Sequence, residues 1–278
     1  MGEKAGTREV INRLVSVLDD EDSTVRSSAW GALVEIGEKA ATSEVISRLA
    51  SALGDQDSDV RNSACEALGT IGDKAVTDEV MNRLVSALCD YNSDDRSGAC
   101  KALGKMGEKA ATNEVMNRLV SALGDKDAAV RSSAREALVE MSEKAAASEV
   151  INRLVSAACD EDPGVRGGAC YTLGEIGEKA ARCEVINRLV SALDDEDSAV
   201  RSSACEALGK MGENTATSEV INRLVSALGD EDLDVRDSAR YALGEMGEKA
   251  ATSGVINRLI SELDDENANV KWSACYAF

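Results

Sequence analysis

Residues 37–71 read GEKAATSEVISRLASALGDQDSDVRNSACEALGTI, and this unit of 35 residues recurs along the whole chain without insertion or deletion. Equivalent valines mark the period at Val10, Val45, Val80, Val115, Val150, Val185, Val220 and Val255. Self-similarity at one fixed period is typical of repeat architectures, in which stacked copies bury a continuous core. The copies occupy 2–36, 37–71, 72–106, 107–141, 142–176, 177–211, 212–246 and 247–278, the last of them truncated. We therefore expect one repeat domain over residues 1–278, with no segment left for a separate catalytic domain.

Each copy predicts two α-helices. In residues 37–71 the first apolar stripe comprises Val45, Ile46, Leu49, Ala52 and Leu53, and the second comprises Val60, Ala64, Ala67, Leu68 and Ile71. Both stripes have the spacing of one helix face. A polar turn at 54–57 separates them, and Gly72 stands where a helix C-cap is favoured. The one proline, Pro163, falls at the first position of a second helix, where its missing N–H costs nothing. The predicted fold class is all-α.

The composition suits thin helical layers and disfavours several kinds of partner. One Phe, two Trp and four Tyr are few for an ordinary globular core, whereas small apolar residues let helices pack closely. The net charge of -20 weighs against nucleic acid, which requires clustered Lys and Arg. No run approaches the roughly 18 apolar residues of a membrane span. We expect a protein or peptide partner and neither nucleic acid nor a membrane. The negative charge of the chain favours a basic partner.

Metal, cofactor and disulfide chemistry is not expected. Five cysteines share one position of the repeat, at Cys65, Cys100, Cys170, Cys205 and Cys275. The chain has no histidine, which disfavours a zinc site. The acidic segment 55–59 resembles the start of an EF-hand loop, but Val60 stands where that loop needs glycine. We expect reduced thiols in a cytoplasmic protein without metal, cofactor or catalytic residues.

The pattern Leu-x-Asp-x-Asp-x-x-Val-Arg-x-x-Ala-x-x-Ala-Leu-Gly-x-Ile-Gly occurs at residues 53–72 and, with Met211 for Ile, at residues 193–212. It resembles HEAT-like repeats of the PBS-lyase type, and the resemblance covers the whole chain. It implies an α-solenoid that forms a right-handed superhelix, and a ladder between turn aspartates and second-helix arginines of neighbouring repeats. The aspartates are Asp20, Asp55, Asp90, Asp125, Asp160, Asp195, Asp230 and Asp265. The basic partners are Arg26, Arg61, Arg96, Arg131, Arg166, Arg201, Arg236 and Lys271.

The third copy departs from this pattern. Asp95 replaces the valine of the second stripe, and Asp94 precedes it. A carboxylate on the core face must be solvated or paired. We therefore expect the second helix of this copy to start late, or this copy to be the weakest of the array.

The resemblance also extends to enzymes. Relatives that hydroxylate deoxyhypusine hold iron through His-Glu motifs, which this chain lacks because it has no histidine. Relatives that excise damaged bases use a basic groove, which does not fit an acidic chain. Lyases that attach bilins to phycobiliproteins have a less explicit signature and stay open as an alternative. Copies this similar offer no distinct catalytic arrangement.

The copies differ most on the second helix, outside its apolar stripe, at positions 30 and 31 of the first copy and their equivalents. In similar proteins this helix lines the concave side, and Tyr, Trp and Arg are enriched at binding hot spots. The residues that we expect to face a partner are Trp30, Glu66, Lys101, Arg135, Glu136, Tyr171, Glu206, Arg240, Tyr241, Trp272 and Tyr276. The alternative is that the tryptophans cover the ends of the stack and the tyrosines pack against neighbouring helices.

The expected function is a non-enzymatic scaffold that binds a protein or peptide through the concave face of its second helices. Three alternatives stay open: a bilin-lyase-like enzyme, a consensus-like or engineered scaffold without a native partner, and a fragment of a longer array. Met1 takes the position of Ile36, and Phe278 that of a buried Leu, so neither end carries a polar cap. We expect these apolar ends to associate end to end.

Overall fold

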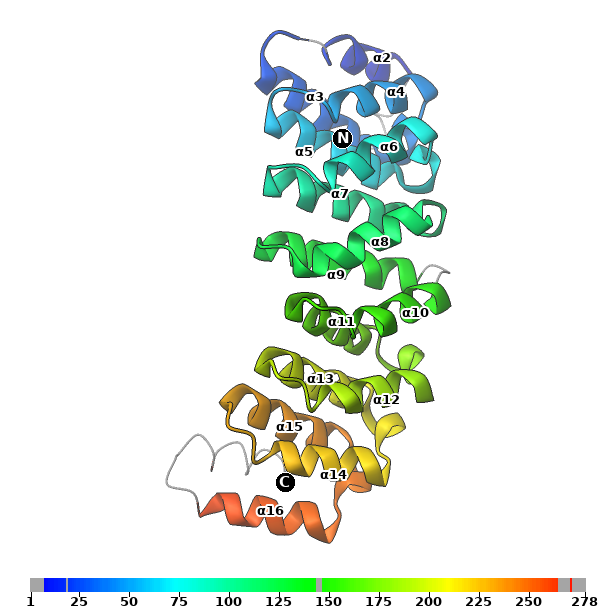
Figure 1. The fold of residues 1–278 in the computed structure, drawn as a ribbon. Coiled ribbons are helices and arrows are strands. Elements are labelled where there is room, and N and C mark those ends of the chain that lie inside the picture. The colour runs from blue at the N-terminus through cyan, green and yellow to red at the C-terminus, as the bar shows by residue number, and fades with distance from the viewer. Residues whose placement is uncertain (1–7, 19, 144–146, 265–270, 272–278) are drawn as a thin grey trace. The chain divides into compact units, whose positions relative to one another are not determined.

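The computed structural model describes residues 8–18, 20–143, 147–264 and 271 (Figure 1). Within these residues the regular structure consists of fifteen α-helices and short 3-10 turns, without a β-strand. This confirms the predicted all-α fold. The packing divides the chain into two compact units, unit 1 with residues 1–150 and unit 2 with residues 151–278. The residues discussed above that lie outside the described part are Met1, Asp265, Trp272, Cys275, Tyr276 and Phe278.

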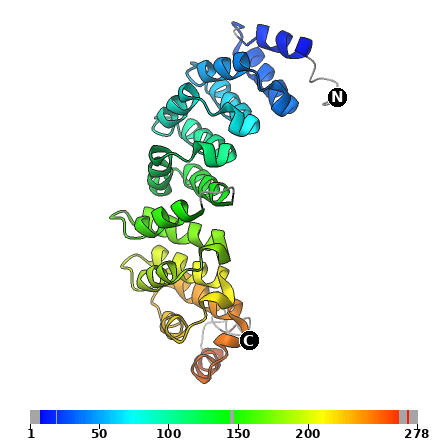
Figure 2. The same cartoon turned by 90° about the vertical axis from the view of Figure 1, so that its right-hand side faces the viewer.

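Unit 1 alternates the two predicted helices of each repeat, here named helix A and helix B. Its A helices are α2 (Arg8–Ser16), α4 (Ser43–Ala52), α6 (Asp78–Ala87) and α8 (Asn113–Ser121). Its B helices are α3 (Ser23–Ile36), α5 (Ser58–Ile71), α7 (Ser93–Met106) and α9 (Ala128–Met141). Within this unit α3 packs on α5, α5 on α7 and α7 on α9, and the repeats follow in chain order in both views (Figures 1 and 2).

Unit 2 repeats this arrangement, and helix α10 (Ala147–Ala157) contains the boundary between the units. Its further A helices are α12 (Cys183–Ala192), α14 (Ser218–Ala227) and α16 (Ser253–Leu263). Its B helices are α11 (Pro163–Ile176), α13 (Ser198–Lys210) and α15 (Leu233–Glu245). Again α11 packs on α13, and α13 on α15.

The helix ends follow from local sequence. Thr42 Oγ1 accepts a hydrogen bond from the backbone of α4 at 3.2 Å, and Asp57 Oδ1 accepts one from the Asp59 N–H at 2.9 Å. Gly72 ends α5 with a φ of 68°, a left-handed conformation that glycine adopts without strain. The link that follows forms a separate 3-10 turn, η2 (Gly72–Ala75), so it does not lengthen the next helix A. Pro163 begins α11, as predicted.

Close packing of the B helices depends on glycine. A Cβ atom on Gly104 would lie 2.7 Å from the Cα atom of Ala137, and one on Gly174 would lie 2.7 Å from the Cα atom of Ala207. Backbone cannot approach a side chain so closely, because real Cβ contacts are longer. These mid-helix glycines therefore let neighbouring B helices touch through their backbones.

The expectation of a late helix start in the third repeat is wrong. Helix α7 begins at Ser93, in the same register as Ser58 at the start of α5. Asp95 is 4% exposed, and its carboxylate pairs with Arg61 of the preceding repeat at 2.7 Å. Because the buried charge is paired, the helix keeps its first turn.

Candidate partner-binding face

An Arg–Asp ladder joins the B helix of one repeat to the turn of the next. Arg26 on α3 donates from Nε and Nη2 to the two carboxylate oxygens of Asp55, at 3.0 and 2.9 Å. Its Nη1 donates to the carbonyl of Asp20, in its own turn, at 2.7 Å. The same fork joins Arg96 to Asp125, Arg166 to Asp195 and Arg201 to Asp230. A planar guanidinium with two parallel hydrogen bonds favours one geometry, so the ladder fixes how successive repeats stack.

The remaining ladder residues make local contacts in the described part. Arg131 and Arg236 donate to the carbonyls of Asp125 and Asp230, in their own turns, at 2.7 and 2.6 Å. Asp160 accepts a hydrogen bond from the Asp162 N–H at 3.0 Å. Lys271 is exposed.

The guanidinium groups stabilise the charged form of their partners. The hydrogen bond from Arg96 lowers the pKa of Asp125, and the hydrogen bond from Arg201 lowers the pKa of Asp230; burial opposes both effects. A carboxylate whose pKa is lower in the folded state adds stability above its unfolded pKa, and that stability is lost as the pH falls through the folded pKa.

The assignment of Asp90 to the ladder is wrong. Arg61 donates from Nε and Nη2 to Oδ2 of Asp95, at 2.9 and 2.7 Å. Asp90 is exposed and accepts a hydrogen bond from the Asn92 N–H at 2.9 Å. Asp95 projects from the core face of α7 toward the preceding layer, so its carboxylate takes the guanidinium. The other oxygen of Asp95, Oδ1, is buried and has no hydrogen-bond partner within the described residues, which makes this rung less favourable than a fork.

Two of the three described residues expected to face a partner at position 30 are buried instead. Trp30 is 1% exposed and Arg240 is 3% exposed, and the Arg240 guanidinium pairs with Asp237 on the same helix. Arg135 is half-buried. The equivalent cysteines Cys65, Cys100, Cys170 and Cys205 are buried as well. Apart from Arg135, the described residues at position 30 therefore pack inside the stack, and the recurrence of cysteine, a residue type often found inside proteins, was the signal for this.

Burial also makes the thiols of these cysteines unreactive. It raises the pKa of the Cys170 and Cys205 thiols to about 12, so they remain protonated at neutral pH. The structure shows all seven described cysteines as free thiols.

Position 31 of helix B is exposed in unit 1 and half-buried in unit 2. In unit 1, Glu66, Lys101 and Glu136 are exposed on α5, α7 and α9. In unit 2, Tyr171, Glu206 and Tyr241 are half-buried on α11, α13 and α15. We name these two sets the B-helix face of unit 1 and the B-helix face of unit 2. Each set follows consecutive B helices, so its members lie on one side of their unit.

The B-helix face of unit 1 contains a groove between α5 and α7. At the α3–α5 junction, Ser27 and Ser63 share a hydrogen bond between their hydroxyls at 3.0 Å. The equivalents at α5–α7 are Asn62 and Gly98, and the Asn62 side chain lies beside Gly98, with its Oδ1 atom 3.0 Å from where a Cβ on Gly98 would be. A polar groove of about 450 Å³ lies at this junction, with Lys101 on its wall. Serine hydroxyls close the next junction again, at Ser97 and Ser133, 2.8 Å apart.

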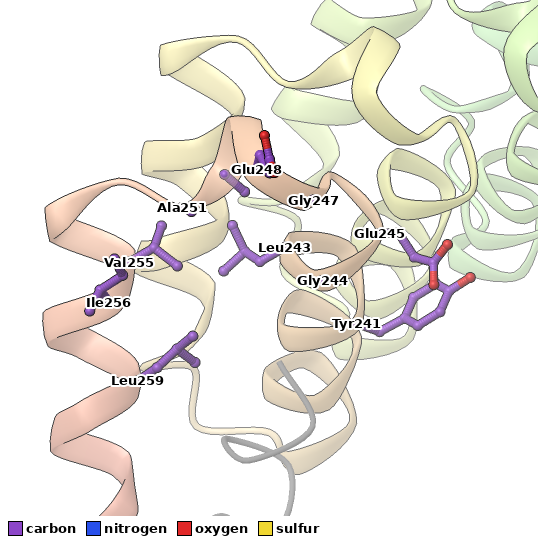
Figure 3. Close-up of a pocket in the computed structure, with 11 residues that line it drawn as sticks. Tyr241, Leu243, Gly244, Glu245, Gly247, Glu248, Ala251, Val255, Ile256 and Leu259 are labelled. Atoms are coloured by element: carbon purple, nitrogen blue, oxygen red, sulfur yellow. The ribbon is translucent and has the colours of Figure 1, made fainter. Parts of the chain in front are cut away.

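The B-helix face of unit 2 combines aromatic rings with acids. The Lys210 ammonium lies 4.3 Å from the centroid of the Tyr171 ring and pairs with Glu175 and Glu206. Tyr241 and Glu245 line a pocket of about 520 Å³ between α15 and α16 (Figure 3). Leu243, Val255 and Leu259 form the apolar part of that pocket, and these are core positions of the repeat.

The described residues contain no group of three or more Cys, Asp or Glu side chains arranged to hold a metal ion. None of their helices is long and apolar enough to span a bilayer.

Comparisons with known proteins place the chain in a family. It matches the family model of HEAT repeats at residues 46–139, 116–183, 154–219 and 186–278. No curated protein sequence matches it significantly.

Solved structures share its fold at low sequence identity. A structure of Kap95p with RanGDP is 14% identical, with a TM-score of 0.72 over 99% of this chain and 42% of that chain. Kap121p bound to Ste12p is 15% identical, with a TM-score of 0.59 over 96% of this chain and 37% of that chain. An engineered protein is 22% identical over 96% of this chain and 77% of that chain, with a TM-score of 0.49. This chain thus spans less than half of the Kap95p and Kap121p chains.

The family model covers residues 46–278, and the described repeats have the two-helix form that the sequence predicts. The chain belongs to the HEAT-repeat family.

Proposed function

We propose that this protein is a non-enzymatic scaffold that binds a protein or peptide through the B-helix faces of its two units. One observation carries the proposal: the copies repeat their core and ladder residues, but they vary at position 31, which is exposed or half-buried. Side chains that vary at exposed points of a regular scaffold supply specificity without altering the fold. The solved structures of Kap95p and Kap121p are likenesses of fold alone and add no partner.

The charge of the faces favours a basic partner. Glu66, Glu136 and Glu206 occupy three of the six B-helix face positions, within a chain of net charge -20. Opposite charges across an interface accelerate association and make it dependent on salt. A basic peptide is therefore the partner that we propose.

An enzymatic role has no support on these faces. The buried cysteines are protonated, and the chain has no histidine to act as a base. Because nucleophilic catalysis needs an activated nucleophile beside a base, we propose binding rather than catalysis.

Selection from a display library of random peptides tests the proposal. We expect the selected peptides to be rich in Lys and Arg. Their binding should weaken at least about tenfold when Glu66, Glu136 and Glu206 are all replaced by Lys. Peptides that bind this variant as tightly as the original chain would refute the use of the B-helix faces.

The A helices offer a matched control. Glu79, Glu184 and Glu219 are exposed on α6, α12 and α14. Replacing these three by Lys changes the net charge from -20 to -14, three steps of +2, as the B-face variant does. Equal losses of binding in both variants would show a general charge effect instead of a binding face.

A further inference from the structure

The groove on the B-helix face of unit 1 holds two opposite charges that do not pair. Glu66 on α5 and Lys101 on α7 occupy position 31 of neighbouring repeats, and both line the polar groove between these helices. Both side chains are exposed, and neither forms an ion pair with a described residue. All residues that line the groove belong to the described part of unit 1. The two charges are therefore available to a ligand.

Other opposite charges one repeat apart pair directly. Glu175 and Lys210, whose spacing of 35 residues is that of the two charges in the groove, form an ion pair. In unit 1, Asp73 and Lys109 of consecutive links meet at 2.9 Å. A spacing of one repeat thus allows a pair, whereas the two position-31 charges of α5 and α7 line an open groove instead.

The groove also presents a free amide group. At the next junction of unit 1, the hydroxyls of Ser97 and Ser133 share a hydrogen bond at 2.8 Å. At α5–α7 the equivalent residues are Asn62 and Gly98, and no described residue forms a hydrogen bond with the half-buried Asn62 side chain. An amide offers N–H donors and a carbonyl acceptor, which are the groups that pair with the C=O and N–H of a peptide backbone. A ligand that satisfies this amide gains a hydrogen bond that the serine pair could not offer.

An extended peptide matches the arrangement of these groups. Consecutive side chains of an extended chain point to opposite sides. A peptide that lies along the groove therefore directs one side chain to α5 and the next to α7, with its backbone between the helices. Charge complementarity requires a basic side chain on the side of Glu66 and an acidic one on the side of Lys101. Asp94 and Lys105 also line the groove, two helix turns before Lys101 and one turn after it.

We propose that the groove between α5 and α7 binds an extended peptide segment in which an acidic residue stands beside a basic one. The acidic side chain pairs with Lys101, the basic one pairs with Glu66, and the backbone between them bonds to the Asn62 amide. The inference rests on the proposed function and deepens it, because it names a sequence feature that a basic peptide carries where it crosses unit 1.

Capped dipeptides test the proposal on the full chain, with the backbone amide signals of Glu66 and Lys101 in a ¹⁵N NMR spectrum as the readout. The probe is acetyl-Glu-Lys-amide. Its comparison is acetyl-Lys-Lys-amide, which the net charge of -20 attracts more strongly wherever binding is non-specific. We expect the Glu-Lys probe to bind at least about twofold more tightly at these signals, the size that an exposed ion pair supplies. Tighter binding of the Lys-Lys probe would overturn the proposal.

Two variants separate the contributions of the charge and the amide. Lys101→Glu gives α7 the residue that Glu66 and Glu136 already are at this position, and it should reverse the preference between the two probes. Replacing both Asn62 and Gly98 by Ser copies the serine pair of the neighbouring junctions. This double variant should weaken the Glu-Lys probe about two- to tenfold, as the loss of a hydrogen bond does. An unchanged affinity for the Glu-Lys probe in either variant would contradict the proposal.

The paired charges of unit 2 supply the internal control. The Lys210 amide signal should respond to neither probe, because Glu175 and Glu206 already bind its ammonium. Groove signals that shift when the protein alone is diluted would place a second copy of the chain in the groove and would also refute the proposal.

The peptide selection is independent of these titrations. Selected peptides that bind the B-helix faces, together with no preference for the Glu-Lys probe, refute this inference alone. The absence of any bound peptide refutes the proposed function.

Discussion

Asp125→Asn tests the stabilising role of the ladder. The carboxylate accepts the fork from Arg96 at 2.8 Å on each oxygen, and it accepts the Asp127 N–H of its own turn at 2.9 Å. The Arg96 side chain is 8% exposed and that of Asp125 is 14% exposed, so water cannot replace the lost acceptor. In the variant, an NH2 group replaces one of the two carboxylate oxygens, so a donor faces one N–H of a guanidinium that has only donors, and the negative charge is lost. Hydrogen bonds to charged groups contribute about 1.5–3 kcal/mol, and breaking a buried pair costs more. We expect a loss of about 2–4 kcal/mol.

The matched control is Asp194→Asn. Asp194 pairs with Arg223 at 2.7 Å, but their side chains are 61% and 45% exposed. An exposed pair contributes at most about 1 kcal/mol, so this variant should lose far less stability. Because repeat arrays need not unfold in one step, the readout is hydrogen exchange at each changed junction: the α7 and α9 amides for Asp125→Asn, and the α12 and α14 amides for Asp194→Asn. Equal losses in both variants, or no loss at Asp125, would refute the account of the ladder.

Three further changes have expected outcomes. Because the pKa of Asp230 is lowered in the folded state, its carboxylate adds stability above its unfolded pKa, and this stability is lost as the pH falls through its folded pKa. An acid titration followed by circular dichroism should show that Asp230→Asn lacks this part of the pH dependence. Gly104→Ala should destabilise by about 1–3 kcal/mol because its Cβ meets the α9 backbone, whereas Gly31→Ala, with open space around it, should stabilise by up to about 1 kcal/mol in urea unfolding. Asp95→Val should free Arg61 to pair with Asp90 as in the other repeats, so Asp90→Ala should cost little in the original chain and much in the Asp95→Val background; equal costs in a double-mutant cycle would contradict this.

The helices could be predicted from the sequence because local patterns determine them. Stripes such as Val60, Ala64 and Leu68 fix which face is buried, and Gly72 and Pro163 fix helix ends. These effects act within one repeat, and the repetition of the pattern confirms each of them several times.

The errors concern contacts between repeats. Whether Asp90 or Asp95 meets Arg61 depends on how far the next helix lies from the guanidinium, which spacing along the chain does not reveal. The burial of Trp30 likewise depends on the neighbouring layer. A helical wheel describes one helix and cannot separate a side chain that faces the next repeat from one that faces water. The groove at Gly98 was missed for the same reason.

The most direct test of the central claim is where a bound peptide protects the chain. Hydrogen exchange measured by mass spectrometry, with and without a peptide from the display selection, compares A and B helices in the same protein. The account predicts slower exchange in B helices such as α5, α7, α13 and α15, and unchanged exchange in α6 and α14. Protection confined to the A helices would contradict it.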